Sequence, residues 1–391
     1  MSGVSARRLA ALLVTVALWA PATASALPSD LSDDPLDRGA LLALPGVYRL
    51  QVDVTVDALV TRDGRRRPVP AEVRRISTLG TAFGVAPGGY VVAAAHVARP
   101  GGESLAVDAR VNQLAAAGRR HDPATARRWV RREGARAGGV RVAARRLTQA
   151  NAGQGAGASR SWAPRPVRVE RRSDLALLRI PAPQAPALPL STIQTEGTPI
   201  VTIGYGGRDA DAELAPVVRR GALGRGGTIR RAPERTLTAV TTGVELGDSG
   251  GPAVDGEGQV RGVVVLRSAA GGIVEPSQAV SQLVRSAGVF PESGAATARF
   301  RAAMRRFWAL DFERAARGFR ATLATFDDHT LARRQLVRAT ALAEQPPGLA
   351  PDGRLRRFLL ALAALSAVAA IGCWIALLAT GRRGGGRPHY D

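Results

Sequence analysis

The sequence predicts a mainly β fold of the barrel type, followed by a short helical part and an apolar C-terminal stretch. Many short apolar runs are separated by turns in a chain that holds 44 glycines and 25 prolines, a pattern typical of β-barrels. Residues 296–344 instead repeat large apolar side chains at helical spacing. Residues 358–380 are continuously apolar or small, and a helix of that length is long enough to cross a bilayer.

The composition limits the classes of protein and of partner. With 391 residues, the chain is long enough for one large core and small additions. The formal net charge is +22 and every basic residue is an arginine, which would attract polyanions. Because the chain is also rich in Ala, Gly and Pro, this charge equally reflects coding bias. Aromatic residues make up only 4% and no nucleic-acid-binding motif is visible, so we do not expect a nucleic-acid partner.

The first 26 residues have the features of a secretory signal. Arg7 and Arg8 provide a positive start, residues 9–19 are apolar but too short to span a bilayer, and Ala24-Ser25-Ala26 offers a small-x-small cleavage site. The alternative is an uncleaved membrane anchor. Residues 27–46 contain several aspartates and prolines and are expected to form a linker.

Alternating and apolar runs predict the strands. Val47 to Val60 alternates with period two, which indicates a half-buried strand, and residues 62–65 and 69–79 indicate a turn and a returning strand. Further strands are expected at 174–180, 200–203, 216–223, 236–242, 259–266 and 272–275, and a helix at 277–286.

Residues 100–164 are longer than a compact barrel needs and predict an inserted loop. An arginine-rich helix is expected at 124–136, because Asp122-Pro123 forms a good helix start. Residues 151–159 are rich in Gly, Ala and Ser and are expected to be flexible. Two interpretations remain open: the insert gates substrate or binds a partner or an anionic envelope polymer, or it is solvated without a specific role.

The most informative stretch is residues 247–252, Gly-Asp-Ser-Gly-Gly-Pro. Glycines let the backbone turn sharply and let amides approach a ligand, which suits an exposed nucleophile, Ser249, above an oxyanion hole formed by the amides of Gly247 and Ser249. The alternative for the serine and its glycines alone is an ordinary turn. A serine nucleophile needs a base and an orienting carboxylate. His96, which follows an apolar strand, and Asp174, at the head of another, meet that need.

These residues resemble a trypsin-like serine protease, and are most similar to the HtrA/Deg branch. Residues 80–92 resemble the hairpin before the catalytic histidine, residues 174–178 the aspartate strand, and residues 198–206 the strand that opens the second barrel. The resemblance covers residues 47–290 and implies a two-barrel, chymotrypsin-type protease domain, with no PDZ domain apparent after it. By the family pattern Gly243 and Leu246 line one wall of the specificity pocket, and Val265, Leu266 and Arg267 the other.

The chain departs from this branch at Asp248, where the branch usually carries asparagine. In the digestive and clotting relatives, an aspartate here pairs with a new amino terminus released by cleavage, and no matching terminus is visible. We expect Asp248 either to have another partner, such as an arginine, or to belong to a loop that switches between states. Gly243 stands where trypsin-like enzymes place an acid, which favours small or medium aliphatic residues in the pocket. Arg267 would narrow this pocket or favour an acidic neighbour.

The C-terminal part predicts a helical hairpin and a membrane anchor. Residues 295–345 resemble a tetratricopeptide unit, too short for a repeat array, and either bind a protein partner or dock on the protease as a stalk. Residues 346–357 form a linker, residues 358–380 a transmembrane helix that holds the only cysteine, Cys373, and residues 381–391 a cytoplasmic tail. His329 is expected to start a helix, and His121 ranks below His96 as a base.

The sequence therefore predicts a membrane-anchored extracytoplasmic serine endopeptidase that hydrolyses peptide bonds of protein or peptide substrates through an acyl-enzyme. No metal and no organic cofactor are expected. The alternative is a protease-shaped sensor or adaptor at the cell envelope, catalytically quiet or activated by a partner bound at residues 296–344.

Overall fold

A computed structural model describes most of the chain between residues 30 and 344. The described residues are 30–62, 65–68, 75–101, 105, 125, 128, 132, 136–149, 160–206, 215–229, 235–268 and 271–344. The predicted signal (1–26), the segment at 151–159, the linker at 346–357, the transmembrane segment (358–380) and the tail (381–391) lie outside them, as do His121 and most of the helix expected at 124–136.

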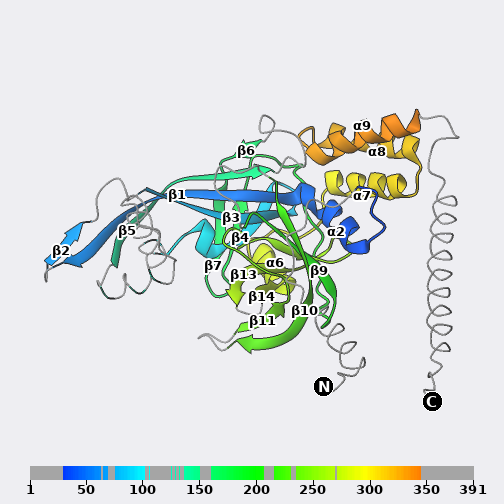
Figure 1. Cartoon of the computed structure of the whole chain (residues 1–391). Coiled ribbons are helices and arrows are strands. Elements are labelled where there is room, and N and C mark those ends of the chain that lie inside the picture. The colour runs from blue at the N-terminus through cyan, green and yellow to red at the C-terminus, as the bar shows by residue number, and fades with distance from the viewer. Residues whose placement is uncertain are drawn as a thin grey trace, which may run out of the picture. The chain divides into compact units, whose positions relative to one another are not determined.

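The first β unit is an eight-stranded antiparallel sheet (Figure 1). Its strands run in the order β6-β5-β1-β3-β4-β8-β7, and β2 pairs with the far end of β1. Alternate residues of β1, among them Tyr48, Leu50 and Val52, are buried in the core, which confirms the period-two prediction. The bounds are β1 Val47–Arg62, β2 Arg65–Pro68, β3 Arg75–Ala86, β4 Tyr90–Ala94, β5 Arg136–Gln149, β6 Ser161–Trp162, β7 Arg165–Glu170 and β8 Leu175–Arg179.

The prediction of an inserted loop at 100–164 is wrong for its second half. Strand β5 pairs with β1 along most of its length, from Tyr48↔Gln149 to Leu59↔Arg136. Leu147 is buried in the core, and Val140 and Val142 pack against it. Arg141 and Arg146 are exposed, whereas Arg145 is partly buried, and the pairing with β1 shifts register opposite Asp53 and Val54, so the local sequence shows no regular alternation.

The second β unit is a closed barrel of six strands in the order β10-β11-β14-β13-β12-β9. Every pairing between its strands is antiparallel, and its core includes Ile200, Leu223, Val264 and Val274. The mainly β, two-barrel architecture expected from the sequence is confirmed. The bounds are β9 Pro199–Gly204, β10 Val217–Ile229, β11 Arg235–Val240, β12 Pro252–Val254, β13 Val260–Ser268 and β14 Gly271–Pro276.

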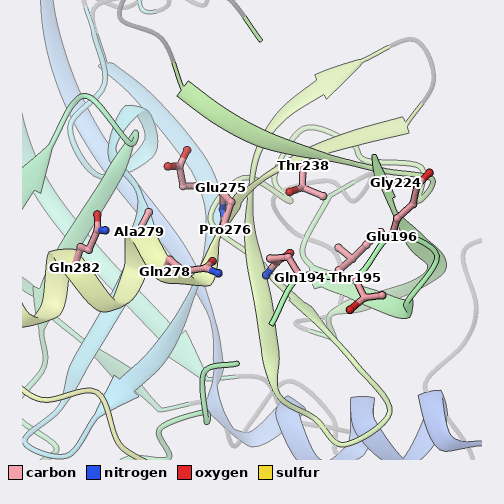
Figure 2. A pocket seen from close by; sticks show the side chains of 11 residues that line it. Gln194, Thr195, Glu196, Gly224, Thr238, Glu275, Pro276, Gln278, Ala279 and Gln282 are labelled. Atoms are coloured by element: carbon pink, nitrogen blue, oxygen red, sulfur yellow. The ribbon is translucent and has the colours of Figure 1, made fainter. Parts of the chain in front are cut away.

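Helix α6 (Ser277–Ser286) follows β14 directly, as predicted. Between α6 and the loop before β9 lies a pocket of about 510 Å³, where Gln278 and Gln194 line opposite sides (Figure 2). The pocket also contains Glu196 and Glu275. It includes none of the candidate catalytic residues, which lie elsewhere in the structure.

The linker expected at 27–46 is a folded segment from residue 30 onward. Helix α2 (Pro35–Ala43) begins at Asp34, whose side chain accepts a hydrogen bond from the Leu36 amide, and a 3₁₀ turn, η1 (Leu44–Gly46), leads into β1. Leu41 and Leu42 are buried. An aspartate before a proline is a helix start as well as a linker feature, and burial of the two leucines favours the helix here.

Three helices follow the second barrel, α7 (Ala295–Trp308), α8 (Phe312–Thr325) and α9 (Thr330–Ala343) (Figure 1). Phe300, Phe307 and Phe319 form their aromatic core. His329 is fully buried, and its Nδ1 accepts a hydrogen bond from the Ala332 amide, so it starts α9 as predicted. Among the described residues, no helix is both long enough and apolar enough to cross a membrane.

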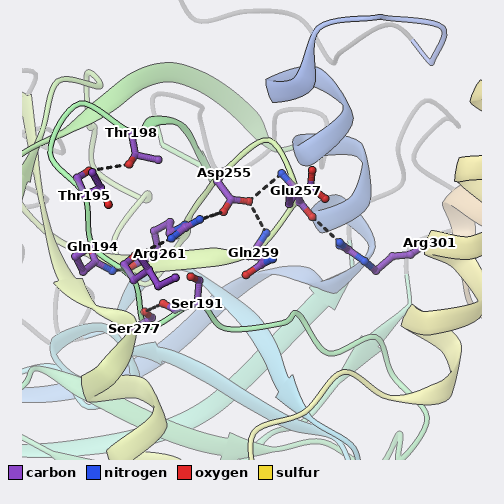
Figure 3. Close-up of polar contacts among 11 residues, drawn as sticks. Ser191, Gln194, Thr195, Thr198, Asp255, Glu257, Gln259, Arg261, Ser277 and Arg301 are labelled. Carbon is purple, nitrogen blue, oxygen red and sulfur yellow. Dashed lines mark hydrogen bonds and ion pairs between the residues drawn. The ribbon is translucent and has the colours of Figure 1, made fainter.

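The helices dock on the second barrel through a hairpin turn (Figure 3). Asp255 accepts hydrogen bonds from the amides of Glu257 and Gln259 and from the Arg261 side chain, which fixes the turn between β12 and β13. Arg301 of α7 donates to the carbonyl oxygen of Glu257. The helical part is therefore joined to the barrel that carries Ser249.

Candidate active site

His96 and Asp174 form a hydrogen-bonded pair at the edge of the first β unit. Strand β4 ends at Ala94, and the short helix α3 (Ala95–Ala98) turns the His96 ring outward. Its Nδ1 lies 2.7 Å from Asp174 Oδ2. The amide of His96 donates to Asp174 Oδ1 at 3.0 Å, and the amide of Ala95 donates to the Asp174 carbonyl oxygen at 2.8 Å. Two contacts thus join His96 to Asp174, and a third holds Asp174 to the neighbouring Ala95.

The backbone of Asp174 is held in an unusual conformation. Its φ is +54°, a left-handed value that among the described non-glycine residues occurs only here and at Leu310. Aspartate tolerates this region better than most residues, but it still costs energy. Strand β8 begins at the next residue and pairs with β4 through Ala94↔Leu175, so the strain places the carboxylate beside the histidine.

This geometry suits a base oriented by a carboxylate. A carboxylate at Nδ1 keeps a proton on that nitrogen, which leaves Nε2 free to accept another. The His96 side chain is 46% exposed, whereas that of Asp174 is only 21% exposed. The imidazole is therefore accessible to a substrate, and its carboxylate partner is largely shielded from water.

The turn that carries Ser249 packs directly on the strands before His96. The Thr81 amide donates to the Ser249 carbonyl oxygen at 2.9 Å, and the Thr81 hydroxyl donates to the Gly247 carbonyl oxygen at 2.8 Å. Gly250 has a φ of +89°, and a Cβ there would lie 2.7 Å from the Ala94 nitrogen and 2.1 Å from the Thr81 carbonyl oxygen. Only glycine fits this close approach, as the motif predicted.

The structure thus brings the three predicted residues to one place but does not join all of them. His96 and Asp174 are hydrogen bonded, and the Ser249 backbone lies against the end of the strand that leads to His96. Among the described residues, no hydrogen bond links the Ser249 hydroxyl to the His96 ring. In enzymes without substrate such catalytic hydrogen bonds are often long.

Asp248 has the partner that the sequence left open. Its Oδ2 lies 2.7 Å from Nη1 of Arg219 in β10, and the two side chains are only 3% and 5% exposed. The same oxygen accepts the Glu245 amide at 2.9 Å, and Oδ1 accepts the Gly206 amide at 2.8 Å. Arg219 also donates to the Gly206 carbonyl oxygen at 3.1 Å. An arginine inside the apolar start of β10 was the sequence signal for this pair.

The electrostatics of Asp248 balance opposing effects. Burial raises the pKa of its carboxyl group, whereas the positive charge of Arg219 and the hydrogen bonds from the Glu245 and Gly206 amides favour the ionised form. The network ties the loop at 243–249 to β9 and β10. The partner of Asp248 is therefore a side chain of the same barrel.

The amides proposed for the oxyanion hole are not used by the protein. Gly247 has a φ of +103°, and a Cβ there would lie 2.8 Å from the Tyr205 carbonyl oxygen. Among the described residues, neither the Gly247 amide nor the Ser249 amide donates a hydrogen bond to another protein group. Both donors remain available for a ligand oxygen.

The two predicted walls of the specificity pocket meet at Gly272 of β14. A Cβ on Gly272 would lie 2.4 Å from a Val244 methyl carbon, and Arg267 is its register partner in β13. Gly243 and Arg267 are exposed, Leu266 is half-buried, and Val265 is buried. Leu246, next to the oxyanion loop, is 76% exposed, which is unusual for a large apolar side chain and suits contact with a substrate.

A cavity of about 480 Å³ opens beside His96 and Asp174. Its far wall includes Val140 and Val142 of β5, a strand that the sequence analysis had assigned to an insert. No cluster of His, Cys, Asp or Glu that could hold a metal ion occurs in the part of the chain that the structure describes.

Comparison with known proteins finds similarity over the part of the chain that contains this site. Residues 80–263 match the family model of the trypsin-like peptidase domain. A structure of the HtrA-type protease AlgW with decapeptide is 15% identical, with a TM-score of 0.42 over 64% of this chain and 66% of that chain. One with tripeptide is 16% identical, with a TM-score of 0.42 over 66% of this chain and 63% of that chain.

These alignments span less than two thirds of the length of either AlgW chain. No curated protein matches the sequence significantly. The family match includes His96, Asp174 and Ser249, and its two ends lie in β3 of the first β unit and β13 of the second. Residues 80–263 of this chain are thus similar to the trypsin-like peptidase domain.

Proposed function

We propose that the chain is a serine endopeptidase whose catalytic residues are His96, Asp174 and Ser249. The observation that carries the proposal is the oriented His96–Asp174 pair beside the Ser249 turn. The loop that presents Ser249 is held by a buried ion pair through Asp248. Orientation of the base and rigidity of the nucleophile loop are the two features that this chemistry needs.

In the proposed reaction, the Ser249 hydroxyl attacks the scissile carbonyl carbon and His96 Nε2 takes its proton. Asp174 holds the imidazole and stabilises the imidazolium that forms. The amides of Gly247 and Ser249 bind the oxyanion of the tetrahedral intermediate. His96 then gives the proton to the leaving amine. In the second half of the reaction water attacks the acyl-enzyme, His96 takes the proton of the water, and the Ser249 oxygen leaves with that proton.

The location is a proposal from the sequence. The predicted signal at 1–26 and the apolar segment at 358–380 support a peptidase domain outside the cytoplasm, tethered to the membrane by its C-terminal end. Fractionation of cells that express the full-length chain tests this. The chain should sediment with membranes, and a chain that ends before residue 358 should not.

Labelling with a fluorophosphonate probe tests the catalytic assignment. The full-length chain should be labelled, and Ser249→Ala should not, because the probe reacts only with an activated serine. His96→Ala should lower the labelling rate by several orders of magnitude. Equal labelling of the parent chain and Ser249→Ala would overturn the assignment.

A second candidate function is a protease-shaped adaptor that a partner activates. It is favoured by one observation, the missing hydrogen bond between Ser249 and His96 among the described residues. If this is correct, the chain alone stays unlabelled, and a partner that binds residues 296–344 restores labelling. Binding through those residues with no labelling under any condition would indicate a purely non-enzymatic adaptor.

A further inference from the structure

The cavity beside His96 combines an apolar wall with positive charge. Val140, Val142 and Val169 are its apolar lining residues, and Arg99, Arg171 and His96 are its basic lining residues. The arginines come from different segments, since Arg99 follows α3 and Arg171 lies in the turn between β7 and β8. Two cations therefore approach one space that also contains the proposed catalytic base.

Few acids of the described part of the chain lie near this positive charge. Among the described residues, Asp174 is the only acidic one that lines the cavity, and both of its carboxylate oxygens are engaged by His96. Within the described part of the chain, neither Arg99 nor Arg171 has an acidic partner within salt-bridge distance. Both side chains belong to exposed residues. They are therefore accessible to a ligand.

A third arginine adds to the field. Arg145 of β5 donates from Nε to the carbonyl oxygen of Ala98 at 3.0 Å, directly before Arg99. Burial, and then the charge of Arg99, lower the pKa of Arg145. The two guanidinium groups thus repel each other, and a bound anion would relieve this repulsion.

We propose that this cavity is a subsite for an acidic substrate residue close to the scissile bond, with Arg99 and Arg171 binding its carboxylate. The proposal rests on the proposed peptidase function and names its substrate class. Guanidinium groups match carboxylates in charge and geometry. The valine wall accommodates the methylene groups of a glutamate or aspartate side chain, which an inorganic anion does not have.

The direct measurement is hydrolysis of quenched fluorescent peptides by the full-length chain. The peptides carry Glu, Gln or Lys at each position on both sides of the scissile bond and have amidated C-termini. At one position kcat/KM should fall about five-fold from Glu to Gln, because exposed charge pairs contribute little more than this, and further from Gln to Lys. The preference should shrink as salt is raised from about 0.05 to 0.5 M.

Charge reversal gives the sharpest form of the test. Arg99→Glu combined with Arg171→Glu should invert the order, so that the Lys peptide is cleaved faster than the Glu peptide. A fold defect slows all peptides and does not invert their order. Arg99→Ala and Arg171→Ala should each reduce the preference. Arg172→Ala, which removes an exposed arginine in the same turn that does not line the cavity, should leave it unchanged.

Two further experiments distinguish the possible results of this test. Peptides with a free C-terminus test whether the cavity binds a chain-end carboxylate instead of a side-chain carboxylate. Only binding of the chain end predicts faster cleavage when the C-terminal amide is removed. Binding of the same peptides to Ser249→Ala, followed by fluorescence anisotropy, measures the preference without turnover. Tighter binding of Glu than of Gln supports the acidic subsite even if no peptide is cleaved. Equal binding and equal cleavage overturn it, although probe labelling would still uphold the peptidase.

Discussion

Two aspartates of the site hold a basic partner at the same distance of 2.7 Å, in opposite surroundings. The Asp174–His96 pair lies near the surface, where the imidazole is 46% exposed, whereas Asp248 and Arg219 are 3% and 5% exposed. In the proposed reaction the exposed pair contacts the substrate, and His96 exchanges protons with it. The buried pair lies out of reach of solvent. One pair is suited to chemistry and the other to holding a loop in place.

The largest effect is expected from Asp174→Asn, which tests whether the exposed pair acts in catalysis. This change keeps the shape of the side chain but removes the charge that orients and stabilises the imidazolium, and in triad enzymes such a change lowers kcat by about 10⁴-fold. Because Asp174 is partly exposed, the thermal unfolding midpoint should change little. Steady-state cleavage of a peptide substrate and a melting curve test both expectations. A large loss of stability without a matching loss of kcat would make Asp174 a structural residue.

The next largest effect is expected from Arg219→Met, which should mainly lower the free energy of unfolding. It leaves the Asp248 carboxylate buried without a cation, which typically costs about 3–5 kcal/mol of unfolding free energy. Labelling by the fluorophosphonate probe should fall too, because the loop at 243–249 loses its tie to β10.

A control removes both charges at once. Arg219→Met combined with Asp248→Asn should recover a large part of the stability and labelling, because no unpaired charge remains buried. Arg219→Lys should show a smaller loss than Arg219→Met. If the double variant is as unstable as the sum of the single variants, the ion pair does not hold the loop.

His329 tests how burial of a titratable group without a charged partner affects the stability of the protein. Burial lowers the pKa of His329 to about 3, so the folded protein keeps this imidazole neutral. The unfolded chain takes up a proton below about pH 6.5, and stability should therefore fall by about 2 kcal/mol between pH 6.5 and pH 5. Denaturant unfolding of the parent chain and of His329→Asn measures it. The asparagine can still accept the Ala332 amide but does not titrate, so the slope should flatten.

The contrast between the pairs also explains what sequence alone could predict. His96, Asp174 and Ser249 were found because each lies in a short local pattern with a chemical reason. Arg219 was not found, because its partner lies 29 residues away and only the closed barrel brings them together. Strand β5 was missed for a related reason. Its arginines resemble those of a solvated insert until pairing with β1 shows which face is buried. The register between strands that are distant in the sequence cannot be predicted from local composition.

The smallest effect is expected from Arg220→Met, the neighbour of the buried arginine. Arg220 contacts Asp34 and Asp37 of the N-terminal segment, but its side chain is 40% exposed and that of Asp34 is 39% exposed. Exposed pairs contribute about 0–1 kcal/mol, so stability and peptide cleavage should change little, and less in high salt. Unfolding curves of Arg219→Met and Arg220→Met, measured side by side, compare two adjacent arginines that face different environments. Equal losses would show that burial does not set the difference between them.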